Sequence, residues 1–389
     1  MRLTTLSFGV AIFAASSLAA QEAKVPFYQD KSNLLLYLDA DGRSHPVTTP
    51  ADWQKRRGHV LANMQLVMGP LPDASKKVPL DVQVVETVDL GKVIRKKLSF
   101  VPETGDRVPA YLLLPKGLSG RAPAMLCLHQ TVAIGKAEPA GLGTNPDLRY
   151  ALELAERGYV TLAPDYPNFG EYKFDPYAHG YASTTMKGIW NHIRAVDLLQ
   201  SLPEVDPERI GAIGHSLGGH NAIYVAVFDP RLKAVVSSCG FNSFFKYYGG
   251  NLAGWSHKGY MPRIAEVYGK DPKRMPFDFT EVVAALAPRP FFTNSPLGDA
   301  NFEHSGVEDC LRAARPVYEL LAAKENLVEV HPDCGHSFPP EARRAAYQFL
   351  DKVLGGRGSE PGRVGPEGVK VRGSGFTERS SSEELIAES

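Results

Sequence analysis

The sequence has no excess of charge of either sign. Its 389 residues include 43 Lys and Arg and 43 Asp and Glu, so the formal net charge is zero. Without a basic excess, nothing favours nucleic acid as a partner, and without an acidic excess, nothing favours a cationic one. No stretch beyond the N-terminal segment is apolar for long enough to cross a bilayer, so no stable membrane insertion is predicted.

Cysteines are also few, and the sequence lacks internal repeats, heptads and metal-type Cys or His spacings. Neither a metal nor an organic cofactor is therefore predicted. Cys127 and Cys239 fall on predicted strands that flank a third strand, about 9–10 Å apart, which is too far for a disulfide. Cys310 and Cys334 lie in one region of the chain and could pair.

The composition divides the chain into four segments. Residues 1–20 have a positive start, a short apolar run and small residues at the end, which is typical of a signal peptide. The mature protein is then expected to be periplasmic or extracellular. Residues 21–77 are polar and contain one candidate helix, expected to pack on the main domain at 78–355. Residues 356–389 have almost no apolar periodicity and are predicted to be disordered.

The main domain begins with strands and continues with strand–helix alternation. Strands predicted near 82–88, 93–101 and 110–114 are joined by short turns, which indicates an antiparallel meander. Further strands and helices then alternate from residue 124 to residue 331. This pattern predicts an α/β fold with a mostly parallel central sheet, an antiparallel N-terminal meander and helices on both faces. The chemistry is expected at the carboxyl ends of the parallel strands.

A candidate nucleophile stands between one of these strands and a helix. The apolar run 210–213 is followed by Gly214-His215-Ser216-Leu217-Gly218 and then by an apolar helical pattern. A sharp strand-to-helix turn exposes the serine hydroxyl, and small residues on both sides permit the tight packing. The N–H of Leu217 then opens the helix and points to where an oxyanion would form.

A serine nucleophile needs a base and a carboxylate that orients the base. His336 follows the last predicted strand on a Gly-His loop, from which its imidazole can reach back over the sheet. Asp299 follows the strand near 290–294 and is the predicted acid. Glu303 and Asp309 are its competitors, and no acid follows the preceding strand between 239 and 250.

Aromatic residues are concentrated in two insertions, 165–183 and 241–287. The second, predicted to be a small lid, could line an acyl or sugar pocket, although its rings could instead pack a core within the lid. The residues predicted to line the substrate pocket are His129, His215, Phe169 and Trp255.

The order Ser216, Asp299, His336 is that of the α/β-hydrolase superfamily, which the chain from about 82 to 354 resembles. Residues 206–219 are similar to the dienelactone hydrolase, acetyl xylan esterase and prolyl oligopeptidase branches. Dienelactone hydrolases use a cysteine nucleophile at the position of Ser216. Prolyl oligopeptidases normally carry a propeller domain, for which too few residues precede the meander.

The resemblance therefore implies a serine hydrolase that cleaves small-molecule or polysaccharide esters, such as an acetyl xylan or glucuronoyl esterase. A peptidase or amidase is the alternative, followed by a non-catalytic binding protein on the same scaffold. The resemblance also places a second oxyanion donor just after the strand at 124–128. The N–H of Thr131 is the predicted donor, and that of Gln130 is the alternative.

Overall fold

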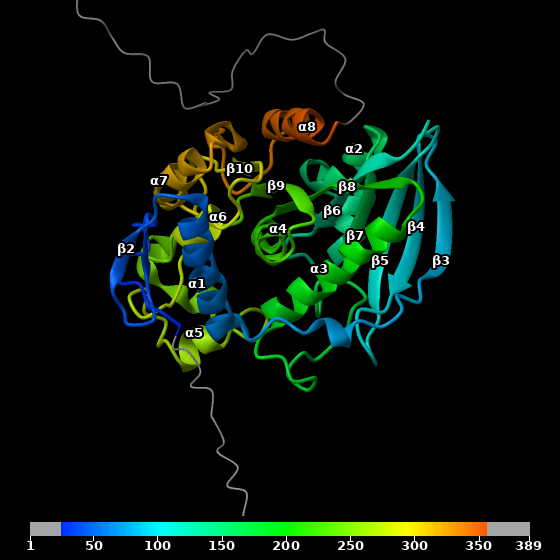
Figure 1. The fold of residues 1–389 in the computed structure, drawn as a ribbon. Coiled ribbons are helices and arrows are strands. Elements are labelled where there is room, and N and C mark those ends of the chain that lie inside the picture. The colour runs from blue at the N-terminus through cyan, green and yellow to red at the C-terminus, as the bar shows by residue number, and fades with distance from the viewer. Residues whose placement is uncertain (1–24, 356–389) are drawn as a thin grey trace, which may run out of the picture.

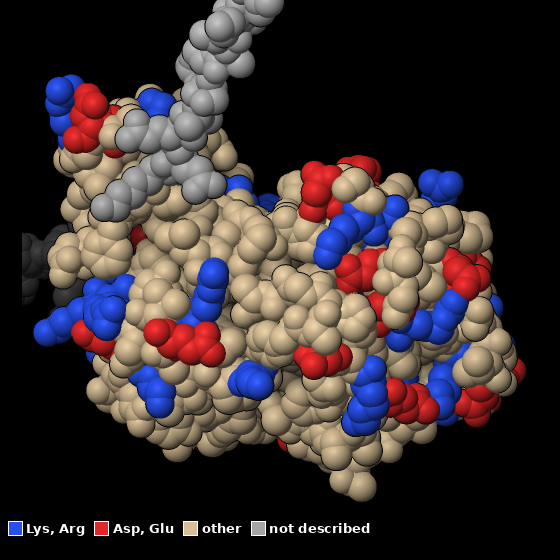
Figure 2. Space-filling view, turned by 90° about the horizontal axis from the view of Figure 1, so that it is seen from below, with Lys and Arg blue, Asp and Glu red and all other residues tan. Residues whose placement is uncertain are grey.

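The computed structural model describes residues 25–355. The signal peptide predicted at 1–20 and the tail predicted at 356–389 lie outside this range. Within it, no helix combines the length and apolar character that a membrane crossing requires. On the face shown in Figure 2, basic and acidic side chains are interspersed, in keeping with the balanced composition.

A nine-stranded sheet forms the centre of the molecule, in the order β11-β10-β9-β8-β6-β7-β5-β4-β3 (Figure 1). Its parallel part comprises β6 (Ala122–Leu128), β7 (Val160–Pro164), β8 (Val205–His215), β9 (Leu232–Ser238), β10 (Phe291–Asn294) and β11 (Leu327–Val330). These strands run parallel, so their carboxyl ends share one edge. The mostly parallel sheet predicted from the sequence is confirmed.

The antiparallel meander consists of β3 (Gln83–Asp89), β4 (Val93–Phe100) and β5 (Val108–Pro115). β5 joins it to the parallel part by pairing antiparallel to β7. β3 is the outer strand, almost entirely exposed, and its register with β4 shifts between Val84 and Glu86. The predicted meander is thus confirmed, and its outer edge is irregular.

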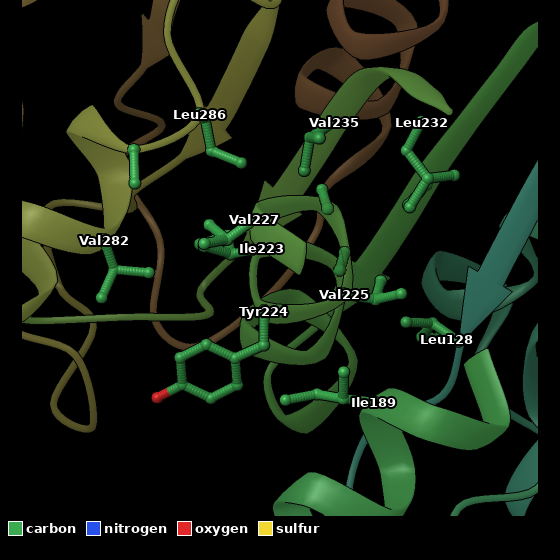
Figure 3. Packing of buried hydrophobic residues seen from close by; sticks show 14 of the residues in the cluster. Leu128, Ile189, Ile223, Tyr224, Val225, Val227, Leu232, Val235, Val282 and Leu286 are labelled. Carbon is green, nitrogen blue, oxygen red and sulfur yellow. The ribbon is translucent and has the colours of Figure 1, made fainter. Parts of the chain in front are cut away.

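Helices cover both faces of the sheet (Figure 1). On one face, α2 (Tyr150–Glu156) and α8 (Pro340–Leu354) share an apolar cluster with the strands. The other face carries α3 (Thr184–Ser201), α4 (Leu217–Phe228), α6 (Phe279–Ala284) and α7 (His304–Leu320). Figure 3 shows α4 in this core, with Leu286 and Val282 to one side and Leu128 and Leu232 to the other. α4 is thus buried on all sides, directly after the turn at Ser216.

The N-terminal part forms a small hairpin and a long helix. β1 (Leu36–Leu38) and β2 (Ser44–Pro46) pair antiparallel as a separate sheet, which the sequence did not predict. α1 (Pro50–Met68) begins at the capping residue Thr49 and buries Trp53, Val60 and Met64 against the rest of the core.

A buried ion pair links α1 to α6. The Arg56 guanidinium donates to Glu281 Oε1 at 2.5 Å, and both side chains are completely buried. The guanidinium also stacks on the Tyr28 ring, 3.4 Å from its centroid. Removing one member of such a pair leaves the other buried without its counter-charge.

Replacing Arg56 by Met is therefore expected to lower the free energy of unfolding by about 3–5 kcal/mol. The Arg56→Met/Glu281→Gln double variant should lose less, because the introduced amide carries no charge and can still accept from the Asp278 N–H, as the Glu281 carboxylate does at 3.1 Å. Urea unfolding measures both changes. Equal losses in the single and the double variant would contradict the assigned charge effect.

The insertion 241–287 contains short helical turns, α5 (Arg263–Glu266) and α6. Most of its rings are buried against one another, including Phe244, Trp255 and Phe279. Phe245 and Tyr248 are the exceptions, with 47% and 59% of their surface exposed.

Candidate active site

Ser216 lies in the sharp turn between β8 and α4, with φ 54° and ψ −117°. A non-glycine residue with this backbone is strained and has to be held by its surroundings. A Cβ on Gly214 would come within 2.2 Å of the Gly218 backbone, and one on Gly218 within 1.8 Å of the Leu128 carbonyl oxygen. No larger residue fits at either position, because the backbone of a neighbouring segment lies too close.

The turn is anchored on the neighbouring strand. The N–H of Ser216 donates to the Ser238 carbonyl at the end of β9, at 2.8 Å. Ser216 is partly exposed, whereas His215 and Leu217 beside it are buried. Leu217 is the first residue of α4, so its N–H precedes the first intrahelical hydrogen bond and is available to an oxyanion.

Asp299 and His336 contact each other directly. Nδ1 of His336 lies 2.9 Å and 3.0 Å from the two carboxylate oxygens. With Nδ1 as the donor, Nε2 is left unprotonated in the neutral ring and can accept a proton. The competitors lie elsewhere: Glu303 accepts from Ser305, and Asp309 pairs with Lys246 and Arg312.

Asp299 is held in place by its own loop. Its Oδ1 accepts from the N–H groups of Asn301 and Phe302, at 2.8 and 3.0 Å. Burial alone would raise the pKa of Asp299, but the hydrogen bonds from His336 and Phe302 outweigh it and leave the pKa below its usual value. The carboxylate therefore stays ionised opposite the imidazole.

The loops that carry the acid and the histidine are joined by backbone hydrogen bonds. Leu297 N–H donates to the Pro332 carbonyl and Gly298 N–H to the Cys334 carbonyl, both at 3.0 Å. The Asn294 side chain holds the other side of the histidine loop by donating to the Ser337 carbonyl at 2.9 Å. These hydrogen bonds hold the two loops together, so that Asp299 and His336 are kept in contact.

His336 lies near the turn at Ser216. Its ring centroid is 4.9 Å from that of His215, the residue before Ser216, and 5.8 Å from that of Phe302. No hydrogen bond joins Ser216 to His336 in this structure; such contacts are often long until substrate binds. His215 is itself fixed, because its Nδ1 lies 3.0 Å from Ser238 Oγ.

The loop after β6 carries the two predicted oxyanion donors. Within residues 25–355, no carbonyl accepts the backbone N–H of Gln130 or Thr131. His129 has a structural role: its Nδ1 lies 2.7 Å from the Gln130 carbonyl, and its Nε2 accepts from the Tyr166 N–H at 2.9 Å. Both ring nitrogens of His129 are therefore occupied, which leaves it no polar atom for a substrate.

Asp165, at the end of β7, ties this loop to the next. Its buried carboxylate accepts from the N–H and Nζ of Lys136, both at 2.8 Å, and from the N–H of Glu171 at 3.0 Å. Gly135 and Gly170 pack on it with left-handed φ, so closely that a Cβ on either would lie 2.2–2.3 Å from Oδ1. Asp165 is therefore a positioning residue for the loop that holds Gln130 and Thr131.

Replacing Asp165 by Asn is expected to lower kcat about 100-fold with little change in KM, because small displacements of catalytic groups cost about that much. Steady-state kinetics on a p-nitrophenyl ester measures this. Glu171→Gln is the control, since Glu171 contacts the same Lys136 ammonium from an exposed position. A rise in KM alone would show that the loop binds substrate and does not place the oxyanion donors.

A group of buried polar side chains lies between α4 and the lid. His220, one turn after Ser216, has its ring 4.8 Å from Trp255 and 5.7 Å from Tyr224. In the part of the chain that the structure describes, neither His220 nitrogen, nor Trp255 Nε1, nor Tyr224 Oη makes a hydrogen bond of normal geometry. Burial lowers the pKa of His220 to about 3, against the opposing effect of the Gly240 carbonyl, so the ring is neutral.

Of the predicted pocket residues, Trp255 belongs to this group and Phe169 lies apart from it. Phe169 packs on His129 with ring centroids 5.5 Å apart, beside the Asp165 loop. Trp255 is almost fully buried among the rings of Phe244, Tyr247 and Phe279, so it belongs largely to the core of the lid. His220 and Asp165 were not predicted; an aspartate directly after a core strand was the available signal for the second.

All four cysteines are free, so Cys310 and Cys334 do not pair. Cys239 occupies the end of β9, and its Sγ, a carboxylate oxygen of Asp299 and a ring nitrogen of His336 lie within 4.8 Å of one another. These three side chains could hold a soft metal ion. The hydrogen bonds that Asp299 and His336 make already account for their placement.

The chain is similar to several known proteins. Residues 140–347 match the model of the alpha/beta hydrolase family. Over 300 residues the chain is 27% identical to the "Putative hydrolase YtaP" of Bacillus subtilis (strain 168), covering 74% of this chain and 96% of that protein. It is 22% identical to 4-O-methyl-glucuronoyl methylesterase 1 of Wolfiporia cocos (strain MD-104), covering 86% and 84%.

Among solved structures, the glucuronoyl esterase from Solibacter usitatus superposes with a TM-score of 0.66 at 21% identity, covering 85% of this chain and 99% of that one. The family match extends over more than half of the sequence, and it includes β8, the turn at Ser216 and α4. By its sheet order and this match, the chain belongs to the alpha/beta hydrolase family.

Proposed function

We propose that the protein is a serine esterase that cleaves carboxylic esters through an acyl-enzyme. The observation that carries this proposal is the Asp299–His336 contact at the same sheet edge as the strained Ser216 turn. A strained, partly exposed serine beside an oriented imidazole is an arrangement suited to nucleophilic attack.

In the proposed mechanism, Nε2 of His336 takes the Ser216 proton as Oγ attacks the ester carbonyl. Asp299 keeps the Nδ1 proton in place and stabilises the imidazolium that forms. The N–H groups of Leu217 and of Thr131 or Gln130 stabilise the oxyanion. His336 then gives its proton to the departing alcohol and activates the water that releases the acid.

We infer further that the substrate carries hydroxyl groups near the ester, as a sugar ester does. The similarity to a glucuronoyl methylesterase and a glucuronoyl esterase supports this class. An extracellular or periplasmic location, proposed from residues 1–20, fits a polysaccharide substrate.

A substrate panel tests the proposal: glucuronoyl esters, acetylated xylan, p-nitrophenyl acetate and an aminoacyl anilide. The sugar esters should give the highest kcat/KM. A higher value for the anilide would favour a peptidase or amidase, and no turnover together with no fluorophosphonate labelling of the folded protein would favour a binding protein.

A further inference from the structure

A cavity of about 710 Å³ lies outside the candidate active site, within the ~300–1,000 Å³ range of small-molecule sites. Its walls come from residues 29–35, from Ser243 and Phe245 at the start of the lid, from the first residues of α6, and from α7. Ser216, Asp299 and His336 do not line it. A ligand bound there would leave the catalytic groups free.

One part of the cavity lining is buried and polar. Lys31 is 4% exposed, and its Nζ makes one hydrogen bond, to the Tyr28 carbonyl at 2.9 Å. An ammonium group has three donors, and the Phe27 ring lies 4.5 Å from Nζ and covers part of the group, so at most two donors remain for a ligand. Beside it, Asp278 accepts from Ser243 Oγ at 3.1 Å, and Thr280 Oγ1 donates to the Lys31 carbonyl at 2.7 Å.

The rim offers planar polar groups and one aromatic face. The side-chain amides of Gln29 and Asn33 are exposed and have no hydrogen-bond partner among the described residues. Asp30 Oδ1 accepts from the N–H and Oγ of Ser32. Phe245 exposes 47% of its surface beside these groups, unlike most rings of the lid.

These properties select a class of ligand. The lining carries three carboxylates, Asp30, Asp278 and Asp309, against the two cations Lys31 and Arg312, so it has no preference for an anion. A sugar ring presents hydroxyl groups that both donate and accept, together with an apolar C–H face that can pack on a phenyl ring. We propose that this cavity is a non-catalytic binding site for a neutral pyranose chain.

The position of the cavity suggests its use. The segment from Cys239, at the end of β9, to Phe245 runs from the catalytic sheet edge to the cavity wall. A polysaccharide held at Phe245 would raise the local concentration of ester groups at Ser216, as a second binding site does. The choice of sugar rests on the proposed esterase function, whereas the existence of the site does not.

Calorimetry with xylohexaose tests the site on the full-length protein before and after fluorophosphonate labelling, which blocks the candidate active site. We expect binding in both forms and at least tenfold weaker binding in Phe245→Ala and Asn33→Ala. Tyr248→Ala is the matched control: Tyr248 lies on the same loop, is 59% exposed and does not line the cavity. Its affinity should be unchanged, and all three variants should hydrolyse p-nitrophenyl acetate like the parent.

The outcomes separate the two proposals. The cavity site would be overturned if xylohexaose did not bind, if Phe245→Ala bound it as tightly as the parent, or if labelling abolished binding. Binding that depends on Phe245, in a protein that hydrolyses no ester and takes no label, would overturn the esterase and leave the cavity site standing.

Discussion

Replacing Ser216 by Ala is expected to lower kcat for ester hydrolysis by roughly 10⁶-fold, because loss of the nucleophile removes the acyl-enzyme route altogether. The fold should be unaffected, since the hydroxyl makes no hydrogen bond that the structure records and the turn is held by backbone contacts of Gly214 and Gly218. Hydrolysis of p-nitrophenyl acetate and covalent labelling by a fluorophosphonate measure the effect.

The matched control is Ser237→Ala. Ser237 lies opposite Gly214 in the sheet register, and its buried hydroxyl has no hydrogen-bond partner between residues 25 and 355, so its removal should change activity little. If Ser216→Ala kept most of its activity and its labelling, the nucleophile would have to be another residue and the mechanism would fail.

Replacing Asp299 by Asn is expected to lower kcat about 10⁴-fold. The amide has nearly the same shape as the carboxylate, but its NH₂ group can donate to Nδ1 of His336, which moves the ring proton to Nε2. The imidazole then cannot accept the proton of Ser216. The pH dependence of kcat measures the change, because activity should partly recover where hydroxide can replace the missing base.

Two variants test whether Asp299, and no nearby acid, has this role. Glu303→Gln and Asp309→Asn change the acids that the sequence left as competitors, and neither contacts His336. Both should keep activity within a few-fold of the parent. A loss in Asp309→Asn as large as that in Asp299→Asn would contradict the assignment.

The sheet could be predicted from the sequence because its central strands are short apolar runs separated by helical patterns. Parallel strands bring their ends together, so Ser216, Asp299 and His336 could be assigned to one edge without knowledge of their distances; their catalytic roles stay predictions. The exact start of a helix is harder to predict: α2 begins at Tyr150, because Pro146–Leu148 before it forms a tighter turn of 3₁₀ helix.

The sequence did not predict features that depend on contacts between residues far apart in the chain. The hairpin of β1 and β2 has three residues in each strand, too few for an alternating pattern to be recognised. The role of Asp165 depends on glycines 30 residues before it and 5 after it, which only the folded chain brings together. The free state of Cys310 and Cys334 was left open because spacing alone does not decide disulfide pairing.

The irregular register of β3 has a consequence for the behaviour of the protein in concentrated solution. An uncovered outer strand with exposed Val84 and Val85 is a template on which another extended chain could add and begin aggregation. The shift between Val84 and Glu86 breaks the even spacing of free N–H and C=O groups, so a straight incoming strand cannot match them. This one-residue irregularity therefore hinders growth of the sheet beyond its last strand.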